Sequence, residues 1–323
     1  MSGNDVSFSL SLALQAAASS FGRTEVLSDV HNLLGLSLLM TAAPHDAAIK
    51  HWSLLARDAF LVEAGRCLGL TIRDIHPPEA AVGVDRAAEF RQHFDASYAP
   101  LIRRALEHGQ TVLAWQGWDG DAEHLWGIIT REDSRGVGFA GLPFAVEGLS
   151  VDKPRELAIT RPPVQLYVVE ERMGPRAETD VWNAMLVRHA VASVDPTLGT
   201  RFGVLSGGPA FRRWAEVVSP VETAGNLTLT RSLLTGIDCF RKGVSEWADF
   251  DSAGRKAAAL LADHARALHG AMQDAHDRLV AAARSASSCD VVLLVAAIRR
   301  AADLTDQTFA ALRVAAPQPE WRR

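Results

Sequence analysis

Two side chains of the sequence occupy positions where their types suit nucleophilic or acid–base chemistry. Ser9 lies near the start of an apolar run that predicts a helix, and His124 follows an acidic loop and precedes an apolar strand pattern. A serine hydroxyl becomes a good nucleophile only when a base is positioned beside it, and histidine is the commonest such base. Asp121 and Glu123 are the nearest carboxylates that could orient the His124 ring.

Each of these residues also has a purely structural interpretation. A serine near the start of a helix usually caps the helix by accepting a backbone N–H. His124 can be a pairing residue at a sheet edge, and Asp121 and Glu123 can be turn residues that aid solubility. The sequence leaves both interpretations open.

A second candidate is an anion site at residues 206–209, Ser-Gly-Gly-Pro, which precede a predicted helix carrying Arg212 and Arg213. Glycines expose their backbone amides and a helix N-terminus attracts anions, so this loop could cradle a phosphate. We favour an ordinary loop with proline at the first helical position.

The sequence predicts no cofactor and no metal. His264, His269 and His276 lie along one predicted helix, but no two of them are four residues apart, as a paired metal site on one helical face prefers. The sequence contains neither a Walker loop nor a glycine fingerprint after a strand. We therefore expect solvated histidines.

Net charge and cysteine content limit the kinds of partner and the cellular compartment that we expect for this protein. The net charge of -5 gives no basic field for nucleic acid, and no window reaches the length of apolar residues that a membrane span needs. Cys67, Cys239 and Cys289 are an odd number of widely separated cysteines, which argues against a disulfide framework. We expect a cytoplasmic protein that binds neither nucleic acid nor membrane.

Hydrophobic periodicity predicts an α+β fold in which helices come first and a mostly antiparallel sheet follows. Helical periods occur over residues 8–21, 25–40, 45–68, 85–95 and 100–108. Alternating patterns predict short strands over residues 70–75, 111–115, 124–130, 136–140, 156–160 and 164–170.

The charged, aperiodic stretch 171–179 predicts a domain boundary. After it the sequence is rich in Ala, Leu and Arg and has helical periods over residues 181–194, 209–218, 227–249, 253–285 and 290–314. We therefore expect an α+β domain over residues 1–172, a helical bundle over residues 178–316 and a polar tail over residues 317–323.

This order of elements resembles that of papain-like cysteine peptidases, which place the nucleophile at the start of a buried helix and its histidine on a later strand. Residues 9–14, running on to 20–23, resemble the opening of bacteriocin-processing double-glycine peptidases and of the butirosin-type acyltransferase N-terminal domain. In these families a cysteine stands at the position of Ser9. Residues 111–115 and 124–130 resemble their strand and histidine strand, with His124 as the matching histidine.

The second half carries a further likeness. Residues 201–203, Arg-Phe-Gly, and residues 209–214, Pro-Ala-Phe-Arg-Arg-Trp, resemble the helical extension that follows the butirosin-type domain. The second half therefore resembles the region that follows the papain-like domain in butirosin-type acyltransferases.

The resemblance implies an oxyanion donor before the nucleophile and an orienting Asp or Asn on the strand after the histidine. Only Asn4 can replace the donor, and residues 141–143, Gly-Leu-Pro, offer no orienting side chain. We therefore expect a degenerate, non-catalytic papain-fold protein that binds a peptide, acyl or carrier-protein ligand in the former active-site cleft.

Two alternatives remain open. One is a serine-dependent hydrolase or acyltransferase that uses Ser9 and His124, with Asp121 and Asn4 as supporting residues. The other is a scaffold whose long Ala-rich helices mediate homo-oligomerisation.

Overall fold

The computed structural model has the α+β architecture that the sequence predicts. It describes residues 6–43, 59–75, 92–122, 125–133, 138–144, 146–147, 150–151, 155–159, 161–172, 178–200, 203–218, 223–244, 252–285 and 291–315. Within these residues no helix combines the length and the apolarity needed to cross a membrane.

The chain divides into two compact units. The first comprises Met1–Leu27 and Arg57–Ala177, and the second comprises Ser28–Ala56 and Glu178–Arg323. The chain therefore passes between the units at three places, because an early segment joins the C-terminal helices. Residues 28–56, which lie within the range expected for the first domain, group with the second unit.

A six-stranded antiparallel sheet forms the centre of the first unit, with the order β2-β9-β3-β4-β5-β8. Its strands are β2 (Leu70–Asp74), β3 (Thr111–Trp115), β4 (Trp126–Glu132), β5 (Phe139–Pro143), β8 (Leu157–Ile159) and β9 (Gln165–Glu171). The short strands β6 (Val146–Glu147) and β7 (Ser150–Val151) pair separately. Strand β2 lies at the sheet edge, as the following Pro77-Pro78 predicts.

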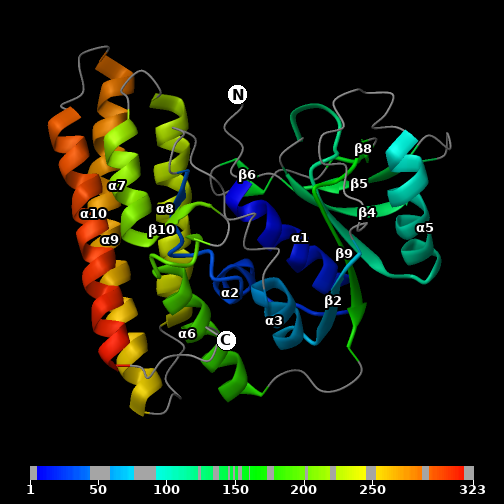
Figure 1. The fold of residues 1–323 in the computed structure, drawn as a ribbon, viewed down its shortest axis with the longest axis horizontal. Coiled ribbons are helices and arrows are strands. Elements are labelled where there is room, and N and C mark those ends of the chain that lie inside the picture. Colours follow the sequence, from blue (N-terminus) through cyan, green and yellow to red (C-terminus); the bar gives the residue numbers. More distant parts are fainter. Residues whose placement is uncertain are drawn as a thin grey trace. The chain divides into compact units, whose positions relative to one another are not determined.

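Helices cover both faces of this sheet (Figure 1). Helices α1 (Val6–Ser20) and α3 (Ala59–Cys67) pack on one face, where α1 contacts β3 and β4 and α3 contacts β2. The π-helix η2 (Phe94–Tyr98) and helix α5 (Ala99–Glu107) contribute to the apolar cluster on the other face. Period-2 alternation explains this division, since successive side chains of a strand point to opposite faces.

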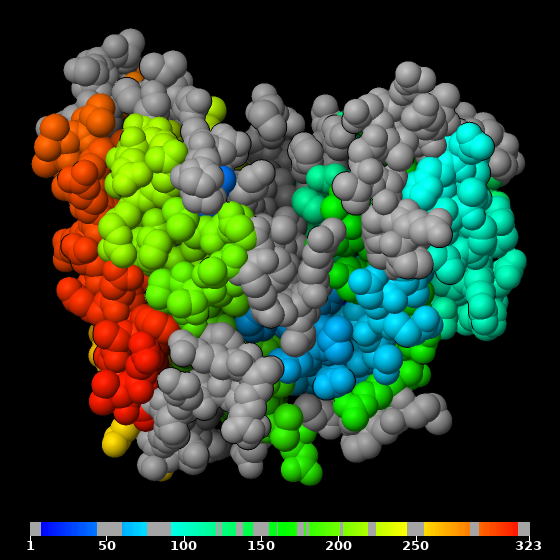
Figure 2. All heavy atoms as spheres, viewed as in Figure 1, coloured from blue at the N-terminus to red at the C-terminus, as the bar shows by residue number. Residues whose placement is uncertain are grey.

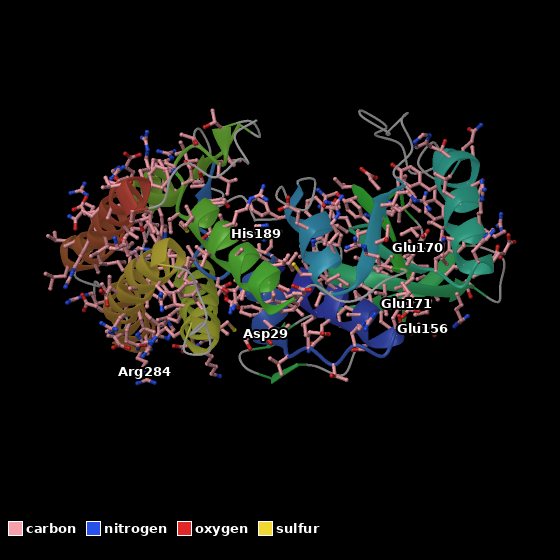
Figure 3. The ribbon with its side chains drawn as sticks, turned by 90° about the horizontal axis from the view of Figure 1, so that it is seen from below. Asp29, Glu156, Glu170, Glu171, His189 and Arg284 are labelled. Carbon is pink, nitrogen blue, oxygen red and sulfur yellow. The ribbon has the colours of Figure 1, made fainter. Side chains whose placement is uncertain are left out.

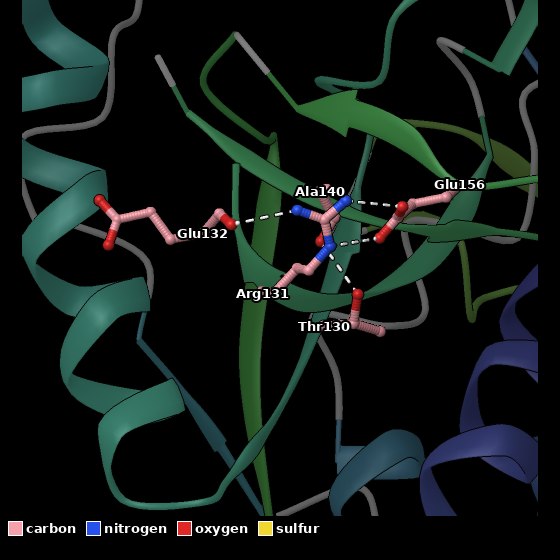
Figure 4. Close-up of polar contacts among 5 residues, drawn as sticks. All are labelled: Thr130, Arg131, Glu132, Ala140 and Glu156. Carbon is pink, nitrogen blue, oxygen red and sulfur yellow. Dashed lines mark hydrogen bonds and ion pairs between the residues drawn. The ribbon is translucent and has the colours of Figure 1, made fainter. Parts of the chain in front are cut away.

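An ion pair ties β4 to the chain that leads into β8 (Figure 4). The register of β4 shifts between Ile129 and Arg131, and the Arg131 guanidinium donates to both carboxylate oxygens of Glu156, at 2.9 and 2.7 Å. The hydrogen bond with Glu156 raises the pKa of Arg131, and in turn Arg131 lowers the pKa of Glu156. The bidentate geometry fixes the direction of the two side chains across the intervening strand β5.

Long helices dominate the second unit. They are α6 (Thr179–Ser193), α7 (Gly207–Val217), α8 (Thr223–Val244), α9 (Ser252–Ser285) and α10 (Val291–Ala315). Helix α9 contacts α6, α8 and α10, and α10 also contacts α7. Leu261, Leu268, Met272 and Leu279 recur at helical spacing along α9 and are fully buried, which explains why the sequence predicts this helix over almost its whole length.

Residues 28–43 are held within the second unit by backbone contacts. Strand β1 (Thr41–Ala42) pairs with β10 (Leu205–Ser206), and the Gly207 amide donates to the Met40 carbonyl at 3.1 Å. The His189 ring on α6, labelled in Figure 3, donates to the carbonyl of Leu33. This segment therefore supplies part of the core on which the C-terminal helices pack.

Two expectations about this region are wrong. The helix expected over residues 25–40 is the shorter α2 (Leu27–Leu33), because Gly35 adopts a positive φ of 66° and turns the chain. The second unit, expected to lack strands, contains β10, which pairs with β1. The expected helix over residues 45–68 lies partly outside the described residues, which begin again at the first residue of α3.

A substitution at Gly236 tests the contact between α8 and this segment. An added Cβ would lie 2.8 Å from the Ser37 carbonyl oxygen, so we expect Gly236→Ala to destabilise the protein by about 1–3 kcal/mol. Gly270→Ala on α9 is the matched control, because nothing lies within 4 Å of its added Cβ. Chemical denaturation followed by circular dichroism should show this control to be more stable than the wild type by up to about 1 kcal/mol. Equal stabilities of the two variants would contradict the packing of residues 28–43 on α8.

Candidate functional site

Ser9 lies inside helix α1 and is fully buried. The helix is apolar on nearly every side, with Phe8, Leu10 and Leu14 at most 2% exposed. The Ser9 hydroxyl accepts the backbone N–H of Trp126 at 3.2 Å, across the boundary between helix and sheet. Ser9 is therefore not a helix cap but an acceptor for the first amide of β4.

The structure places only part of the predicted set of site residues. His124, Glu123 and Asn4 lie outside the described residues, and Asp121 lies in the short 3-10 helix η3 (Gly120–Ala122). In the sequence, Trp126, whose amide the Ser9 hydroxyl accepts, follows His124 by two positions. The described geometry thus joins helix α1 to the start of β4.

An aromatic stack adjoins this contact. The ring of Trp126 stacks on Trp115, with centroids 6.4 Å apart, and on Tyr167, with centroids 6.2 Å apart. Trp126 is fully buried, whereas Trp115 is half-buried. The stack itself follows from the register, which pairs Trp115 with Trp126 and brings Tyr167 onto the same face.

Two further residues at this end of the strands were not singled out by sequence reasoning. Gln165 lies opposite Trp115 in the register and its polar side chain is 3% exposed. Gln116 has a φ of 67° and is the one non-glycine residue with positive φ among those described. Such backbone strain persists where the surrounding structure demands it, often near functional sites.

The possible phosphate loop before α7 already has an anion from the protein itself. A Cβ added to Gly208 would lie 2.0 Å from a carboxylate oxygen of Asp306, so this carboxylate lies against the start of the helix. Asp306 also pairs with Arg212 at 2.6 Å. The helix dipole and the arginine therefore stabilise a carboxylate of the protein itself, which argues against a phosphate site. The expected loop is also wrong, because residues 207–209 form the first turn of α7 and the proline is its third residue, not its first.

The histidines of α9 do not converge on a metal site. His269 lies 3.6 Å from Asp238, and the His276 ring bonds the Thr230 hydroxyl at 2.8 Å. His264 is 3% exposed, and neither of its ring nitrogens has a hydrogen-bond partner in the described part of the chain. No group of three metal-ligating side chains occurs among the described residues. His264 is thus buried rather than solvated as expected.

Burial shifts the titration of two histidines in the second unit. It lowers the pKa of His31 to about 3 and that of His264 to about 4, because the charged imidazolium is poorly solvated inside the protein. Both rings are therefore neutral in the folded protein at pH 7.

No model of a known protein family matches the chain, and no curated protein matches its sequence. The assignment of a function therefore depends on the geometry of the site.

Ser9→Ala tests the acceptor role of the hydroxyl. The substitution leaves the buried N–H of Trp126 without its acceptor, and we expect a loss of about 1–3 kcal/mol in the free energy of unfolding. Ser19→Ala is the control in the same helix, since that exposed hydroxyl bonds only to the Gln15 carbonyl one turn earlier. If chemical denaturation gives equal stabilities for the two variants, the contact between Ser9 and Trp126 is not structural.

His264→Leu tests the energetic cost of the buried imidazole. The unfolded ring binds a proton below its ordinary pKa of 6.5, whereas the folded ring does so only near pH 4, so stability falls as the pH drops through this window. Between pH 7 and pH 5 the wild type should lose about 2 kcal/mol more than His264→Leu. Urea denaturation at both pH values measures the difference. An identical pH dependence would contradict the buried, neutral state of His264.

Proposed function

We propose that the first unit is a non-catalytic papain-like domain that binds a peptide, acyl or carrier-protein ligand. The observation that carries this proposal is that the Ser9 hydroxyl is buried and hydrogen-bonded. A nucleophile must reach its substrate, whereas this hydroxyl has no exposed surface and accepts the N–H of Trp126. The position where the resembling enzymes have their cysteine thus serves to attach helix α1 to the sheet.

The layout of the first unit supports the papain-like part of the proposal. Its buried helix α1 precedes the sheet in sequence and contacts β3 and β4. The start of that helix meets the start of β4, directly after the segment that carries the matching histidine. A fold can keep its architecture when its reactive group is lost, because function depends on the site rather than on the fold.

The second candidate function uses the same serine. Ser9 contacts Trp126, which follows His124 by two positions in the sequence. The protein would be a serine-dependent hydrolase or acyltransferase that forms an acyl-serine. This alternative requires a reactive Ser9, which the buried state does not supply.

The homo-oligomeric scaffold receives less support. In the described part of the second unit the large apolar side chains of α10 that are exposed include Val292, Leu293 and Val314. Val292 and Leu293 lie in the first turn of α10 and Val314 in its last, so these residues do not form one patch on the helix (Figure 2 shows α10 in red along one flank). We also propose a cytoplasmic location, since the two cysteines that the structure describes, Cys67 and Cys239, form no disulfide.

Fluorophosphonate labelling separates the leading proposal from the enzyme. We expect no labelling of Ser9 between pH 5 and pH 9, because the hydroxyl is buried and engaged. The variant Ser9→Ala defines the background, and mass spectrometry locates any modified residue. Labelling of Ser9 that the variant loses would support the acyl-serine enzyme and overturn the non-catalytic assignment.

Photo-crosslinking tests binding itself. Diazirine-bearing fatty acid, peptide and acyl-carrier-protein probes should crosslink to peptides of the first unit, above all to those from α1, β3 and β4. Excess unlabelled probe should suppress these crosslinks. If none of the three probe classes crosslinks to the first unit, the ligand-binding proposal is wrong.

A further inference from the structure

The indole N–H of Trp126 is a buried hydrogen-bond donor for which the described residues supply no acceptor. Its side chain is fully buried, and Nε1 has no hydrogen-bond partner within the residues that the structure describes. More than nine in ten buried polar groups of native proteins are paired, since an unpaired donor is costly. Such an exception calls for a physical explanation.

Stacking restricts the ring of Trp126. The ring lies between Trp115 and Tyr167 at interplanar angles of 23° and 29°. The backbone N–H of the same residue is held by Ser9. Reorienting the indole toward another acceptor would disrupt this stack, so the unpaired N–H is built into the arrangement of β3, β4 and β9.

The surroundings combine apolar and polar groups in the manner of a small-molecule site. The aromatic rings provide flat apolar walls, and the Ser9 hydroxyl and the buried Gln165 side chain lie on the same face of the sheet. Binding sites typically join such walls to a few fixed polar groups. The strained Gln116 lies beside them, directly after β3.

We propose that the indole N–H of Trp126 receives the carbonyl or carboxylate oxygen of an acyl ligand. This inference rests on the proposed ligand-binding function and narrows its ligand to the acyl class. The oxygen supplies the acceptor that the free protein lacks, and the aromatic stack contacts the apolar chain that follows the carbonyl carbon. Binding requires a local opening of the buried site, and the acceptor gained on binding helps to stabilise the bound state.

Trp118 provides a matched control. Its side chain is 1% exposed and its Nε1 also lacks a partner among the described residues. However, Trp118 belongs to the apolar cluster with Phe94 and Phe139 on the opposite face of the sheet. Replacing either tryptophan by phenylalanine removes one buried indole N–H that has no partner among the described residues. The two variants therefore differ in which face of the sheet loses this N–H.

The test is the affinity of the full-length protein for 11-(dansylamino)undecanoic acid, measured by the increase in dansyl fluorescence. We expect Trp126→Phe to weaken binding by about ten-fold, the effect of one lost hydrogen bond, and Trp118→Phe to bind as the wild type does. Circular dichroism and thermal unfolding without probe establish that both variants are folded.

A ligand analogue makes the test independent of the variant's folding. The dansylated hydrocarbon without the carboxylate should bind the wild type about ten-fold more weakly than the acid, after correction for its partitioning. In Trp126→Phe this difference between acid and hydrocarbon should disappear.

The outcomes separate this inference from the proposed function. If the wild type and Trp126→Phe bind the acid equally, or if the wild type does not distinguish the acid from the hydrocarbon, the role of the indole N–H is refuted while ligand binding stands. If the wild type does not bind the acid but crosslinks to the peptide or carrier-protein probe, the acyl class is wrong. If no probe binds at all, the proposed function fails as well.

Discussion

The burial of helix α1 is the constraint on which the first unit depends. Its sequence is apolar on nearly every side, from Phe8 through Leu14 to Ala18, so the helix cannot lie at a surface. These side chains are removed from water only if other elements pack around the helix, and strands β3 and β4 do so on one side. The buried serine near its start must then find a partner inside the protein, and the first amide of β4 is that partner.

This constraint connects the fold to the proposed function. A serine hydroxyl held as a structural acceptor is a poor nucleophile in the folded protein, because the N–H of Trp126 engages a lone pair of its oxygen. The same contact fixes the start of β4, where Trp126 stacks between Trp115 and Tyr167. The burial of the Ser9 hydroxyl and the ordered aromatic stack are therefore two consequences of one arrangement.

Much of the fold could be predicted because its local patterns agree with its tertiary contacts. Period-2 alternation located β3 exactly, and Gly22, with a φ of 75°, ends α1 as its sequence position predicts. The helical period also located α9 and α10, since one face of each is buried along its length. In these elements propensity, periodicity and packing all favour the same structure.

The remaining features depend on contacts that are distant in sequence. The helix expected over residues 25–40 ends at Leu33 because residues 28–43 bond to α6 and pair with β10, more than 150 positions later. The caps and turns that the sequence suggests for Ser9 and Gly208 are replaced by contacts with Trp126 and Asp306. No local pattern around Ser9 indicates a partner 117 positions away. Candidate residues could thus be chosen from the sequence, but the interactions of Ser9 and Trp126 could not.

The most direct measurement of the central claim is the native-state hydrogen exchange of the Trp126 backbone amide, followed by NMR. If this N–H is buried and held by the Ser9 hydroxyl, it should exchange as slowly as the amides in the middle of β3, through global unfolding alone. Exchange at the rate of an amide in an exposed turn would show that the hydroxyl is free, and would contradict the structural role assigned to Ser9.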